Sequence, residues 1–475
     1  TRLPELRFEE PLNWIIEEGQ QWGVIGPNGA GKTLIADVMQ RKFALKEGEV
    51  AFGYEGNVGT LVKSIAFKDI YSLADCRNSY YQQRWHSTET DEVPTIEDIL
   101  KEDAGSEDYH KVLSLFGIEE LLPKKLIFLS SGELRKFLIV RTLLKHPRVL
   151  ILDNPFIGLD APSRGVLVEM LQQITKLKCV QVVLLLSNPD DIPEMITHVL
   201  PVKQRKCLPV YSREEFLKQT DLIADLFPFE GKEDSVRSGA FSLPVGEQKE
   251  PSAHLVTFRM EHVSIKYGNR TILKDLDWEV RNGEKWALFG PNGAGKSTLL
   301  SLIYADNPQS YACDISLFGR KRGTGESIWE IKKHIGYVSP EMHRAYLKNL
   351  PAIEIVASGL HDSIGLYKRP QPEQMAICEW WMDIFGIADL KDKPFLQLSS
   401  GEQRLSLLAR AFVKDPELLI LDEPLHGLDT YNRRRVKKVI EAFCRRKDKT
   451  MIMVTHYESE LPNTITDRIF LKRNR

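Results

Sequence analysis

The sequence lacks the features that mark secreted, membrane-spanning and nucleic-acid-binding proteins. Its six cysteines are scattered over 475 residues without a C-x-x-C pair, which favours reduced thiols over a disulfide framework. No apolar run approaches the roughly 20 residues of a transmembrane helix. A net charge of −2 provides no basic field for nucleic acid or anionic lipid. We therefore expect a cytoplasmic protein, at most peripheral at the inner face of the cell membrane, and the charge disfavours nucleic acid as a partner.

Two copies of one phosphate-binding loop are the strongest signal in the sequence. GPNGAGKT and GPNGAGKS both fit G-x-x-x-x-G-K-[ST], in which backbone N–H groups cradle phosphates, the lysine reaches the β- and γ-phosphates and the last hydroxyl suits Mg²⁺. ATP and Mg²⁺ are the expected cofactors. The expected binding residues are Gly26, Asn28, Gly29, Gly31, Lys32 and Thr33 in the first half, and Gly290, Asn292, Gly293, Gly295, Lys296, Ser297 and Thr298 in the second.

Further motifs recur in the same order, which indicates a duplication. The LSSGE segment that starts at Leu129 returns at Leu398, and the apolar segment that ends at Asp153 returns as one that ends at Asp422; 398 − 129 and 422 − 153 both equal 269. A repeat of this length indicates two whole domains rather than a solenoid. We assign residues 1–227 to the first domain, 228–253 to a linker and 254–475 to the second domain.

Alternating apolar and helical patterns predict an α/β fold for each half. Trp22–Ile25 and Trp286–Phe289 are short apolar runs that lead into the phosphate loops, as buried parallel strands do. The stretches from about 71 to 126 and from 343 to 395 lack strand alternation, and we expect an inserted helical subdomain in each. The prediction is two P-loop domains, each with a mostly parallel sheet and a helical insert.

The order of these motifs resembles that of the ATP-binding cassette (ABC) ATPases over nearly the whole chain. Leu317–Ser339 is further similar to the second cassette of the ModF-type tandem ATPases, which are known as molybdate-transport or photorepair-associated proteins. The resemblance implies that the two cassettes pair within the chain, with each ATP held between the phosphate loop of one and the LS-x-G-[QE] signature of the other. The signature residues expected at ATP are Ser130, Gly132, Ser399 and Gly401.

In the second half, the resemblance fills every role that hydrolysis needs. Asp422 is expected to bind Mg²⁺ with Ser297, and Glu423 follows Asp422 as the candidate general base. His456 takes the position of the family's switch histidine, which contacts the γ-phosphate, and Tyr267 is placed to stack on adenine. The expected catalytic residues are Glu423, His456 and Lys296.

The first half departs from this pattern. Asn154 stands in place of the base after Asp153, and an amide orients water but cannot accept its proton. Asn188 is aligned with His456, and no aromatic residue aligns with Tyr267. A general base contributes about 10²–10⁴ in rate. Thr33 and Asp153 remain for Mg²⁺. We therefore expect one hydrolytic site and one site that holds ATP.

The glutamine that the family places after the strand entering the helical insert is also replaced. Glu341 stands there in the second half, and Asp69 is its counterpart in the first, with Gln82 and Gln83 as poorer alternatives. A carboxylate binds Mg²⁺ but repels the γ-phosphate, so coupling to a transmembrane partner is less well supported than ATP binding. Glu341 is kept as a candidate Mg²⁺ ligand.

Two functions stay open at this point. One is an ATPase subunit that energises a permease in a separate chain, with molybdate implied by the family name alone. The other is a non-transport ABC protein that acts in translation, in nucleic-acid repair or as an ATP sensor. The short acidic segment 228–253 differs from the long basic linkers of translation-factor members. Among minor features, His426 is expected to be a loop residue without a role and Arg320–Arg322 a solvated turn.

Overall fold

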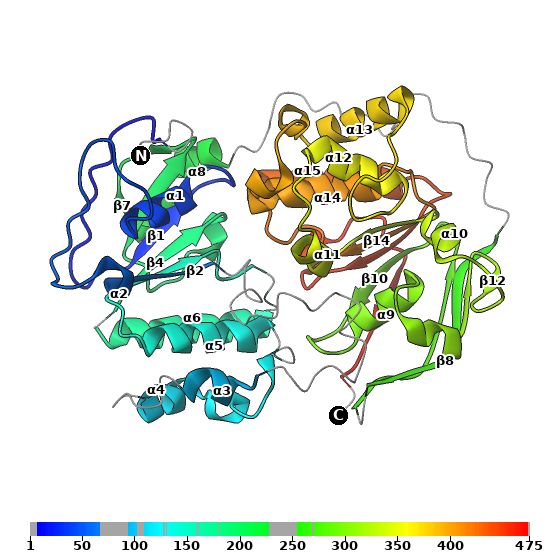
Figure 1. Cartoon of the computed structure of the whole chain (residues 1–475), viewed down its shortest axis with the longest axis horizontal. Coiled ribbons are helices and arrows are strands. Elements are labelled where there is room, and N and C mark those ends of the chain that lie inside the picture. The colour runs from blue at the N-terminus through cyan, green and yellow to red at the C-terminus, as the bar shows by residue number, and fades with distance from the viewer. Residues whose placement is uncertain are drawn as a thin grey trace. The chain divides into compact units, whose positions relative to one another are not determined.

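The computed structural model describes most of the chain as two compact units (Figure 1). The described residues are 7–66, 94–101, 109–126, 129, 131–157, 159, 161–178, 180–227, 254–267 and 270–473. The first unit consists mainly of Thr1–Asn78 and Thr90–Glu230, and the second mainly of Gly231–His426 and Asn432–Arg475. The predicted linker 228–253 lies outside the described residues, as do Asp69, Gln82, Gln83 and Ser130.

The first unit is built on a mostly parallel sheet. Its strands are β1 (Trp22–Ile25), β2 (Val62–Ala66), β3 (Val149–Asp153), β4 (Gln181–Leu186), β5 (His198–Lys203), β6 (Lys206–Cys207) and β7 (Tyr211–Ser212). The order is β2-β3-β4-β1-β5-β6, with β7 paired to β5. Strands β1 to β5 are parallel, and the two short strands β6 and β7 run antiparallel to β5. The inner strands β1, β3 and β4 are buried apolar runs, as is usual where helices cover both faces of a parallel sheet.

Helices cover both faces of this sheet. The helices of this unit are α1 (Lys32–Met39), α2 (Val58–Leu61), α3 (Ile96–Leu100), α4 (Tyr109–Phe116), α5 (Ser131–Leu143), α6 (Ala161–Lys176), α7 (Arg213–Lys218) and α8 (Thr220–Leu226), with 3-10 turns at Glu119–Leu121 and Pro189–Asp191. Leu150 and Leu152 of β3 pack with α5 and α6, whereas Val149 and Ile151 pack with α1. This alternation fixes the register of β3, because a slip of one residue would exchange the two faces.

The second unit contains two sheets. Its strands are β8 (Val256–Tyr267), β9 (Arg270–Arg281), β10 (Lys285–Phe289), β11 (Asp314–Leu317), β12 (Arg320–Lys321), β13 (Ile335–Val338), β14 (Leu418–Asp422), β15 (Thr450–Val454) and β16 (Asp467–Phe470). The parallel sheet has the order β13-β14-β15-β10-β16, and the antiparallel sheet has the order β12-β11-β8-β9. Apolar side chains of both sheets share one core.

The helices of the second unit include a helical insert between β13 and β14. They are α9 (Lys296–Ile303), α10 (Ile328–Lys332), α11 (Pro340–Ala345), α12 (Ala352–Ala357), α13 (Pro372–Ile384), α14 (Ser400–Phe412) and α15 (Thr430–Cys444), with 3-10 turns at Pro308–Ala312, Ser358–Leu360, Ala388–Leu390, Phe395–Gln397 and Glu458–Glu460. Helix α9 packs in the core that the two sheets share. The predicted α/β class, with mostly parallel sheets and helical inserts, is confirmed.

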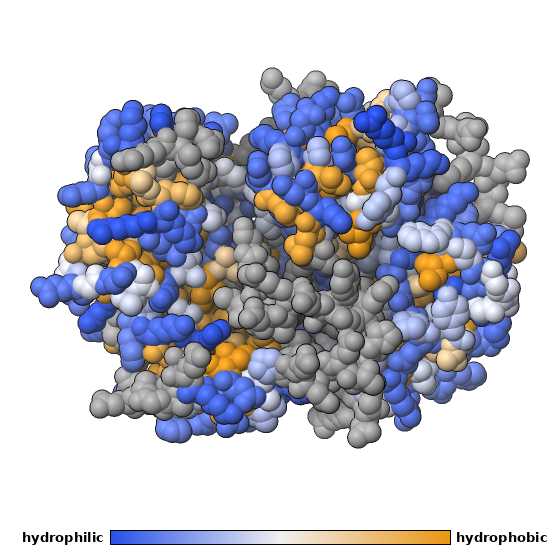
Figure 2. All heavy atoms as spheres, in the orientation of Figure 1, coloured by the Kyte–Doolittle hydropathy of each residue, from blue (hydrophilic) through white to orange (hydrophobic). Residues whose placement is uncertain are grey.

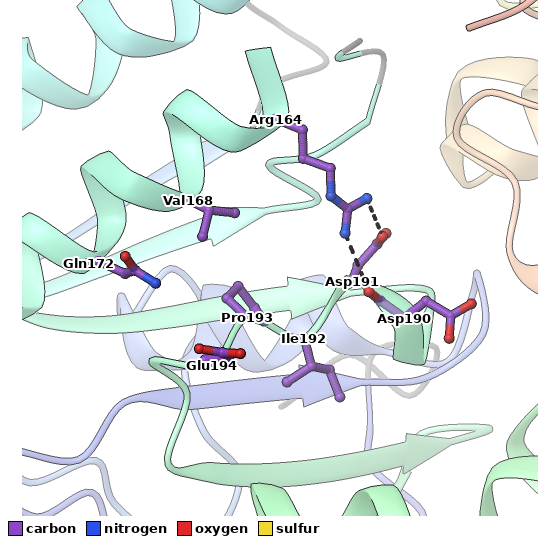
Figure 3. A pocket seen from close by; sticks show the side chains of 8 residues that line it. All are labelled: Arg164, Val168, Gln172, Asp190, Asp191, Ile192, Pro193 and Glu194. Carbon is purple, nitrogen blue, oxygen red and sulfur yellow. Dashed lines mark hydrogen bonds and ion pairs between the residues drawn. The ribbon is translucent and has the colours of Figure 1, made fainter. Parts of the chain in front are cut away.

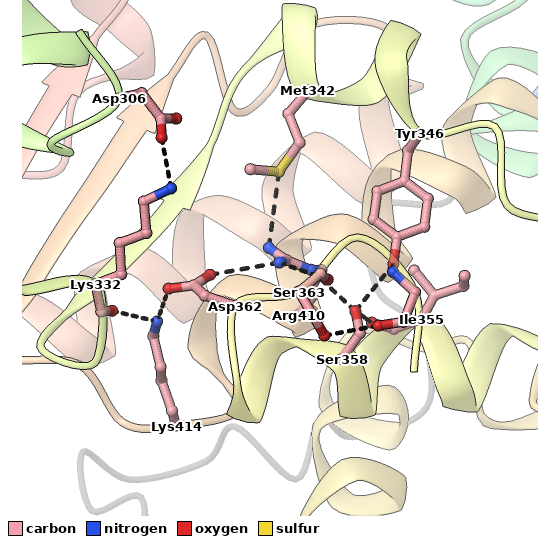
Figure 4. Close-up of polar contacts among 11 residues, drawn as sticks. Asp306, Lys332, Met342, Tyr346, Ile355, Ser358, Asp362, Ser363, Arg410 and Lys414 are labelled. Carbon is pink, nitrogen blue, oxygen red and sulfur yellow. Dashed lines mark hydrogen bonds and ion pairs between the residues drawn. The ribbon is translucent and has the colours of Figure 1, made fainter. Parts of the chain in front are cut away.

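A buried polar network anchors α14 within the second unit (Figure 4). The carboxylate of Asp362 accepts a hydrogen bond from Arg410 Nη2 of α14 at 3.4 Å and contacts Lys414 Nζ just beyond that helix. Lys414 also donates to the backbone oxygen of Lys332 at 2.6 Å, and Lys332 Nζ lies 2.5 Å from Asp306. Because Asp306 follows α9 closely, polar contacts connect the end of that helix to α14.

The structure differs from the sequence prediction of a solvated turn at Arg320–Arg322. Arg320 and Lys321 are exposed, but the side chain of Arg322 is buried and its guanidinium lies 2.6 Å from Glu326. The turn folds back so that Glu326 reaches Arg322, and the ring of Tyr311 lies 4.4 Å from the guanidinium carbon. The expectation of a solvated turn was therefore wrong for Arg322.

Apolar side chains are also exposed on the helical insert of the second unit, and Figure 2 shows apolar surface over α12 and α14. The exposed large apolar residues of the insert are Leu347, Ile364, Tyr367 and Leu396. The cysteines Cys207, Cys313, Cys378 and Cys444 are free thiols. Among the helices that the structure describes, none combines the length and the apolar composition required to cross a bilayer.

Candidate nucleotide sites

Each phosphate loop joins a central strand to a helix, β1 to α1 and β10 to α9. The helices begin after Gly31 and Gly295, whose φ angles of 105° and 94° lie in the left-handed region that favours glycine. A Cβ atom on Gly295 would lie 2.8 Å from Ile272, and one on Gly26 would lie 2.1 Å from the backbone oxygen of Val202. These positions leave room for glycine alone, and each helix N-terminus supplies N–H groups suited to an anion.

The predicted loop residues all lie where the sequence places them. Gly26, Asn28, Gly29, Gly31, Lys32 and Thr33 lie in the first loop and its helix, and Gly290, Asn292, Gly293, Gly295, Lys296, Ser297 and Thr298 lie in the second. Lys32 Nζ donates to the backbone oxygens of Gly26 and Pro27, both at 2.8 Å, and Lys296 Nζ donates to that of Gly290 at 2.5 Å. Burial lowers the pKa of Lys32 to about 8. Each lysine lies over its own loop, where phosphates would bind.

In the first unit, the polar groups at the end of β3 are hydrogen-bonded to one another. Thr33 Oγ1 donates to Asp153 Oδ2 at 3.0 Å, and Asn154 Nδ2 donates to Asp153 Oδ1 at 2.9 Å. The Ser187 hydroxyl lies 3.1 Å from Asn154 Oδ1 and 3.0 Å from Asn28 Oδ1. A hydroxyl and a carboxylate are oxygen ligands that suit Mg²⁺. The amide of Asn154 supplies no group that accepts a proton.

In the second unit, the residue at the same position is a carboxylate between two histidines. Glu423 Oε1 lies 3.1 Å from His456 Nε2, and Glu423 Oε2 lies 3.0 Å from His426 Nδ1. Burial raises the pKa of Glu423, but the contacts with His426 and His456 outweigh it and hold that pKa well below its usual range. Glu423 is therefore ionised at neutral pH.

Asp422 lies beside this carboxylate in a different environment. Burial, together with the negative charges of Glu423 and Glu341, raises the pKa of Asp422 well above its usual value. Glu341 lies in the first turn of α11, close enough for its charge to act on Asp422. No cluster of three or more His, Cys, Asp or Glu side chains in the described part of the chain forms a ready metal site.

The sheet register corrects the predicted counterpart of His456. Asp153 pairs with Leu185, and Asp422 pairs with Val454, so the residues two places further on are Ser187 and His456. Asn188 is instead the cap of the 3-10 turn Pro189–Asp191, because its Oδ1 accepts a hydrogen bond from the N–H of Asp190 at 3.1 Å. The alignment of Asn188 with His456 was wrong by one residue.

His426 is the residue of this site whose contact the sequence did not predict. It does lie in a loop, in a turn where its N–H donates to the backbone oxygen of Glu423 at 3.1 Å. This turn brings the imidazole back to the carboxylate three residues earlier. In the first unit, the corresponding turn joins the N–H of Ile157 to the oxygen of Asn154 at 3.3 Å. The sequence feature that could have indicated this contact is a polar residue three places after the candidate base.

An arginine–carboxylate pair stabilises the loops around both sites. In the second unit, Arg433 Nε donates to the backbone oxygen of Leu425 at 3.2 Å, and its Nη2 lies 3.2 Å from Glu460. Glu460 also accepts a hydrogen bond from Thr455, next to His456. In the first unit, Arg164 lies 2.6 Å from Asp191, beside a pocket of about 280 Å³ (Figure 3). The pair is present in both units, although the reactive side chains differ.

The signature segments begin long helices. Ser399 caps α14: its hydroxyl accepts from the N–H of Glu402 at 3.3 Å, and Glu402 accepts from the N–H of Ser399 at 2.7 Å. Gly401 lies in the first turn of α14, and Gly132 in that of α5. Arg404 of α14 donates to the backbone oxygen of Asp422 at 3.1 Å, which joins this helix to the end of β14. Contact of either signature with ATP stays a prediction.

Tyr267 ends β8 and is half-buried. Its hydroxyl accepts a hydrogen bond from Asn307 Nδ2 at 2.9 Å, and burial raises its pKa to about 12. The phenol therefore stays neutral, and stacking of its ring on adenine stays a prediction.

The fold and the two phosphate loops define a protein of two P-loop nucleotide-binding units, each with a signature helix in its helical part. The sequence pattern of the ABC transporter family matches residues 10–157 and 273–426, so the chain belongs to this family as a tandem ABC ATPase. "ABC transporter ATP-binding protein ModF" of Escherichia coli K12 is 36% identical, over 98% of this chain and 94% of its own. An "Uncharacterized ABC transporter ATP-binding protein" of Schizosaccharomyces pombe is 31% identical, over 98% of this chain and 96% of its own.

Solved structures of similar fold are also tandem proteins. A "Model of ribosome-bound archaeal Pelota and ABCE1" contains a chain with a TM-score of 0.58 over 93% of this chain and 70% of its own. The archaeal ribosome recycling factor aABCE1, in complex with the ribosomal stalk protein aP1, gives a TM-score of 0.52 over 93% and 81%. Sequence identity is 18% in both cases, so these comparisons show the fold alone.

Proposed function

We propose that this tandem ABC ATPase hydrolyses ATP with Mg²⁺ in the second unit and holds ATP without rapid hydrolysis in the first. The observation that carries the proposal is the pair of residues after the two strand-end aspartates. Glu423 is an ionised carboxylate in contact with two histidines, whereas Asn154 is an amide hydrogen-bonded to Asp153. Water attack on the γ-phosphate requires a group that accepts the water's proton, and only the carboxylate of this pair does so.

Each side chain of the second site then has a distinct task. Glu423 accepts the proton of the attacking water, His456 contacts the γ-phosphate and Lys296 holds the β- and γ-phosphates. Ser297 and Asp422 would hold Mg²⁺, with Glu341 as a further ligand. Bound Mg²⁺ supplies positive charge that stabilises the phosphoryl group during transfer. In the first unit, Thr33 and Asp153 would hold Mg²⁺ in the same way.

The test is ATP turnover of the full chain beside its Glu423→Gln and Asn154→Ala variants. Glu423→Gln should lower turnover by about 10²–10⁴-fold, the typical contribution of a general base, while binding of about two nucleotides per chain persists. Asn154→Ala is the matched control and should leave turnover within about twofold, because its amide takes no proton. Unchanged turnover in Glu423→Gln would contradict the proposal.

We further propose that hydrolysis energises a membrane permease in a separate chain. Support comes from the relatives, whose names describe ABC transporter ATP-binding proteins, and from the exposed apolar side chains of the second helical insert. Molybdate, which the ModF-type resemblance implies, is the first cargo to test. The alternative is a non-transport ABC protein that acts in translation, in nucleic-acid repair or as an ATP sensor.

Crosslinking in cells followed by purification of the chain separates the two. A polytopic membrane protein recovered with the wild-type chain, and lost when Leu347 and Tyr367 are replaced by serine, would support the transport role. Recovery of ribosomal RNA or ribosomal proteins instead would support the alternative. Lys218→Ser, at an exposed position on the first unit, serves as the control substitution.

A further inference from the structure

Each oxygen atom of Glu423 has its own histidine partner, and the two histidines come from different loops. His456 follows β15 and contacts Oε1 at 3.1 Å, and His426 follows β14 and contacts Oε2 at 3.0 Å. All three side chains are largely buried: the exposed fractions are 11% for His456, 19% for Glu423 and 20% for His426. Because a carboxylate oxygen accepts, His426 Nδ1 carries the proton of its hydrogen bond.

The loops that carry the histidines are themselves held together. Arg433 donates to the backbone oxygen of Leu425, directly before His426, and pairs with Glu460. Glu460 accepts from Thr455, directly before His456. One arginine therefore connects both histidine-bearing loops, and the contacts with Glu423 lie within a fixed frame rather than on two independent loops.

The contacts of the two histidines with Glu423 are expected to change differently when ATP binds. In the proposed function, His456 contacts the γ-phosphate, so its contact with Glu423 is shared with the nucleotide or lost. The backbone of Glu423 has a φ of 49°, and its carboxylate stands beside the carboxyl group of Asp422. If the contact with His456 were lost and no second partner remained, the Glu423 carboxylate would be free to turn away from the attacking water. His426 is the side chain that keeps one oxygen of Glu423 in place.

We propose that His426 is a positioning residue of the second site: its Nδ1–H holds the Glu423 carboxylate toward the attacking water while His456 engages the nucleotide. This inference rests on the proposed hydrolysis at that site. His426 acts through Glu423 rather than on ATP itself, and its loss should slow turnover without weakening the binding of ATP.

The first unit provides an internal comparison. The positions of Glu423, His426 and His456 are occupied there by Asn154, Ile157 and Ser187. The ion pair of the frame is retained, because Arg164 and Asp191 form the same pair as Arg433 and Glu460. The other contacts of the frame differ, because Arg164 donates to the backbone oxygen of Asp190 and Leu186 stands in place of Thr455. His426 therefore changes together with the reactive residues while the ion pair stays the same, as expected of a residue with a role in the reaction.

The test compares two substitutions of His426 that differ in one donor. In His426→Asn, the side-chain amide nitrogen takes nearly the place of Nδ1, whereas His426→Ala has no donor. His426→Ala should lower kcat by about tenfold to a hundredfold, the worth of a hydrogen bond to a charged group, with the KM for ATP nearly unchanged. His426→Asn should recover most of that loss. Ile157→Ala is the matched control in the first unit and should leave kcat unchanged.

A double variant distinguishes failure of this inference from failure of the proposed function. In the Glu423→Gln background, His426→Ala should cause no further loss, because the carboxylate on which it acts is gone. Wild-type kcat in His426→Ala, or equal defects in His426→Ala and His426→Asn, would overturn the positioning role alone. Full turnover in Glu423→Gln, or none in the wild type, would instead contradict the proposed function and the inference with it.

Discussion

Ser187 and His456 occupy the same position in their two sheets, and each lies 3.1 Å from the side chain that follows a strand-end aspartate. The pairing differs only in chemistry. In one unit a hydroxyl lies against an amide oxygen, and in the other an imidazole lies against a carboxylate. The backbone that presents them is alike, since the N–H after each aspartate donates at 2.9 Å to the strand beside it.

This likeness predicts that the first unit can be made hydrolytic. In a Glu423→Gln background, Asn154→Glu combined with Ser187→His should restore turnover to at least about tenfold above that background, because a general base contributes about 10²–10⁴. Asn154→Glu alone should recover less, since its carboxylate would have no imidazole partner. Steady-state phosphate release measures both. Absence of any gain in the combined variant would show that the first unit lacks more than these two groups.

The network around Asp362 predicts a large and local loss of stability. Asp362→Ala leaves Arg410 and Lys414 buried without their carboxylate, and the removal of one partner from a buried ion pair costs about 3–5 kcal/mol. Urea denaturation of the full chain should show an earlier transition for the second unit and an unchanged one for the first. Glu379→Ala is the control in the same insert, because the Glu379–Lys391 pair is half-exposed and such pairs contribute little. Equal effects of the two substitutions would contradict this account.

The contacts of Asp415 predict how acid changes the stability of the second unit. Burial raises the pKa of Asp415, but bonds from Arg446 at 2.5 and 2.8 Å and from Lys449 at 2.8 Å outweigh it, so the net pKa is lowered. The folded pKa is below the unfolded value of about 3.9. The stabilisation is therefore present above about pH 4 and is lost as the pH falls through the folded pKa.

The measurement is the free energy of unfolding of wild type and Asp415→Asn between about pH 7 and pH 2. The difference between them should be constant above about pH 4 and shrink below it. Asp448→Asn is the control, because Asp448 is more exposed and lies 3.7 Å from the same two cations. A difference that grows toward low pH would show that the sign of the shift is wrong.

Much of the fold could be predicted because its signals are local. The phosphate loops, the strands that end at Asp153 and Asp422, and the tandem arrangement follow from residues close in sequence, and the structure and the family match confirm them. The counterpart of His456 was misplaced by one residue, although the offset of 269 between the other repeated motifs leads from His456 to Ser187. Ser187 and Asn188 are adjacent polar residues after one strand, and the pairing of β3 with β4 confirms Ser187.

The contacts that the sequence missed depend on backbone turns. His426 reaches Glu423 because the chain turns back within three residues, and Arg322 is buried because a similar turn brings Glu326 against it. Residue type and spacing do not specify such turns, whereas they do specify the glycine-rich loops. Ser130 and Asp69 lie outside the described residues, so their roles stay predictions from the family resemblance.

The amide at Asn154 has a consequence for the lifetime of bound nucleotide. ATP beside a group that takes no proton would leave mainly by dissociation, so its residence time would be set by affinity and not by cleavage. Occupancy of the first unit would then follow the ratio of ATP to ADP in the cell, averaged over many turnovers of the second. The chain would then combine two processes of different rate: slow nucleotide exchange in the first unit, which depends on the ATP and ADP concentrations in the cell, and faster ATP hydrolysis in the second unit.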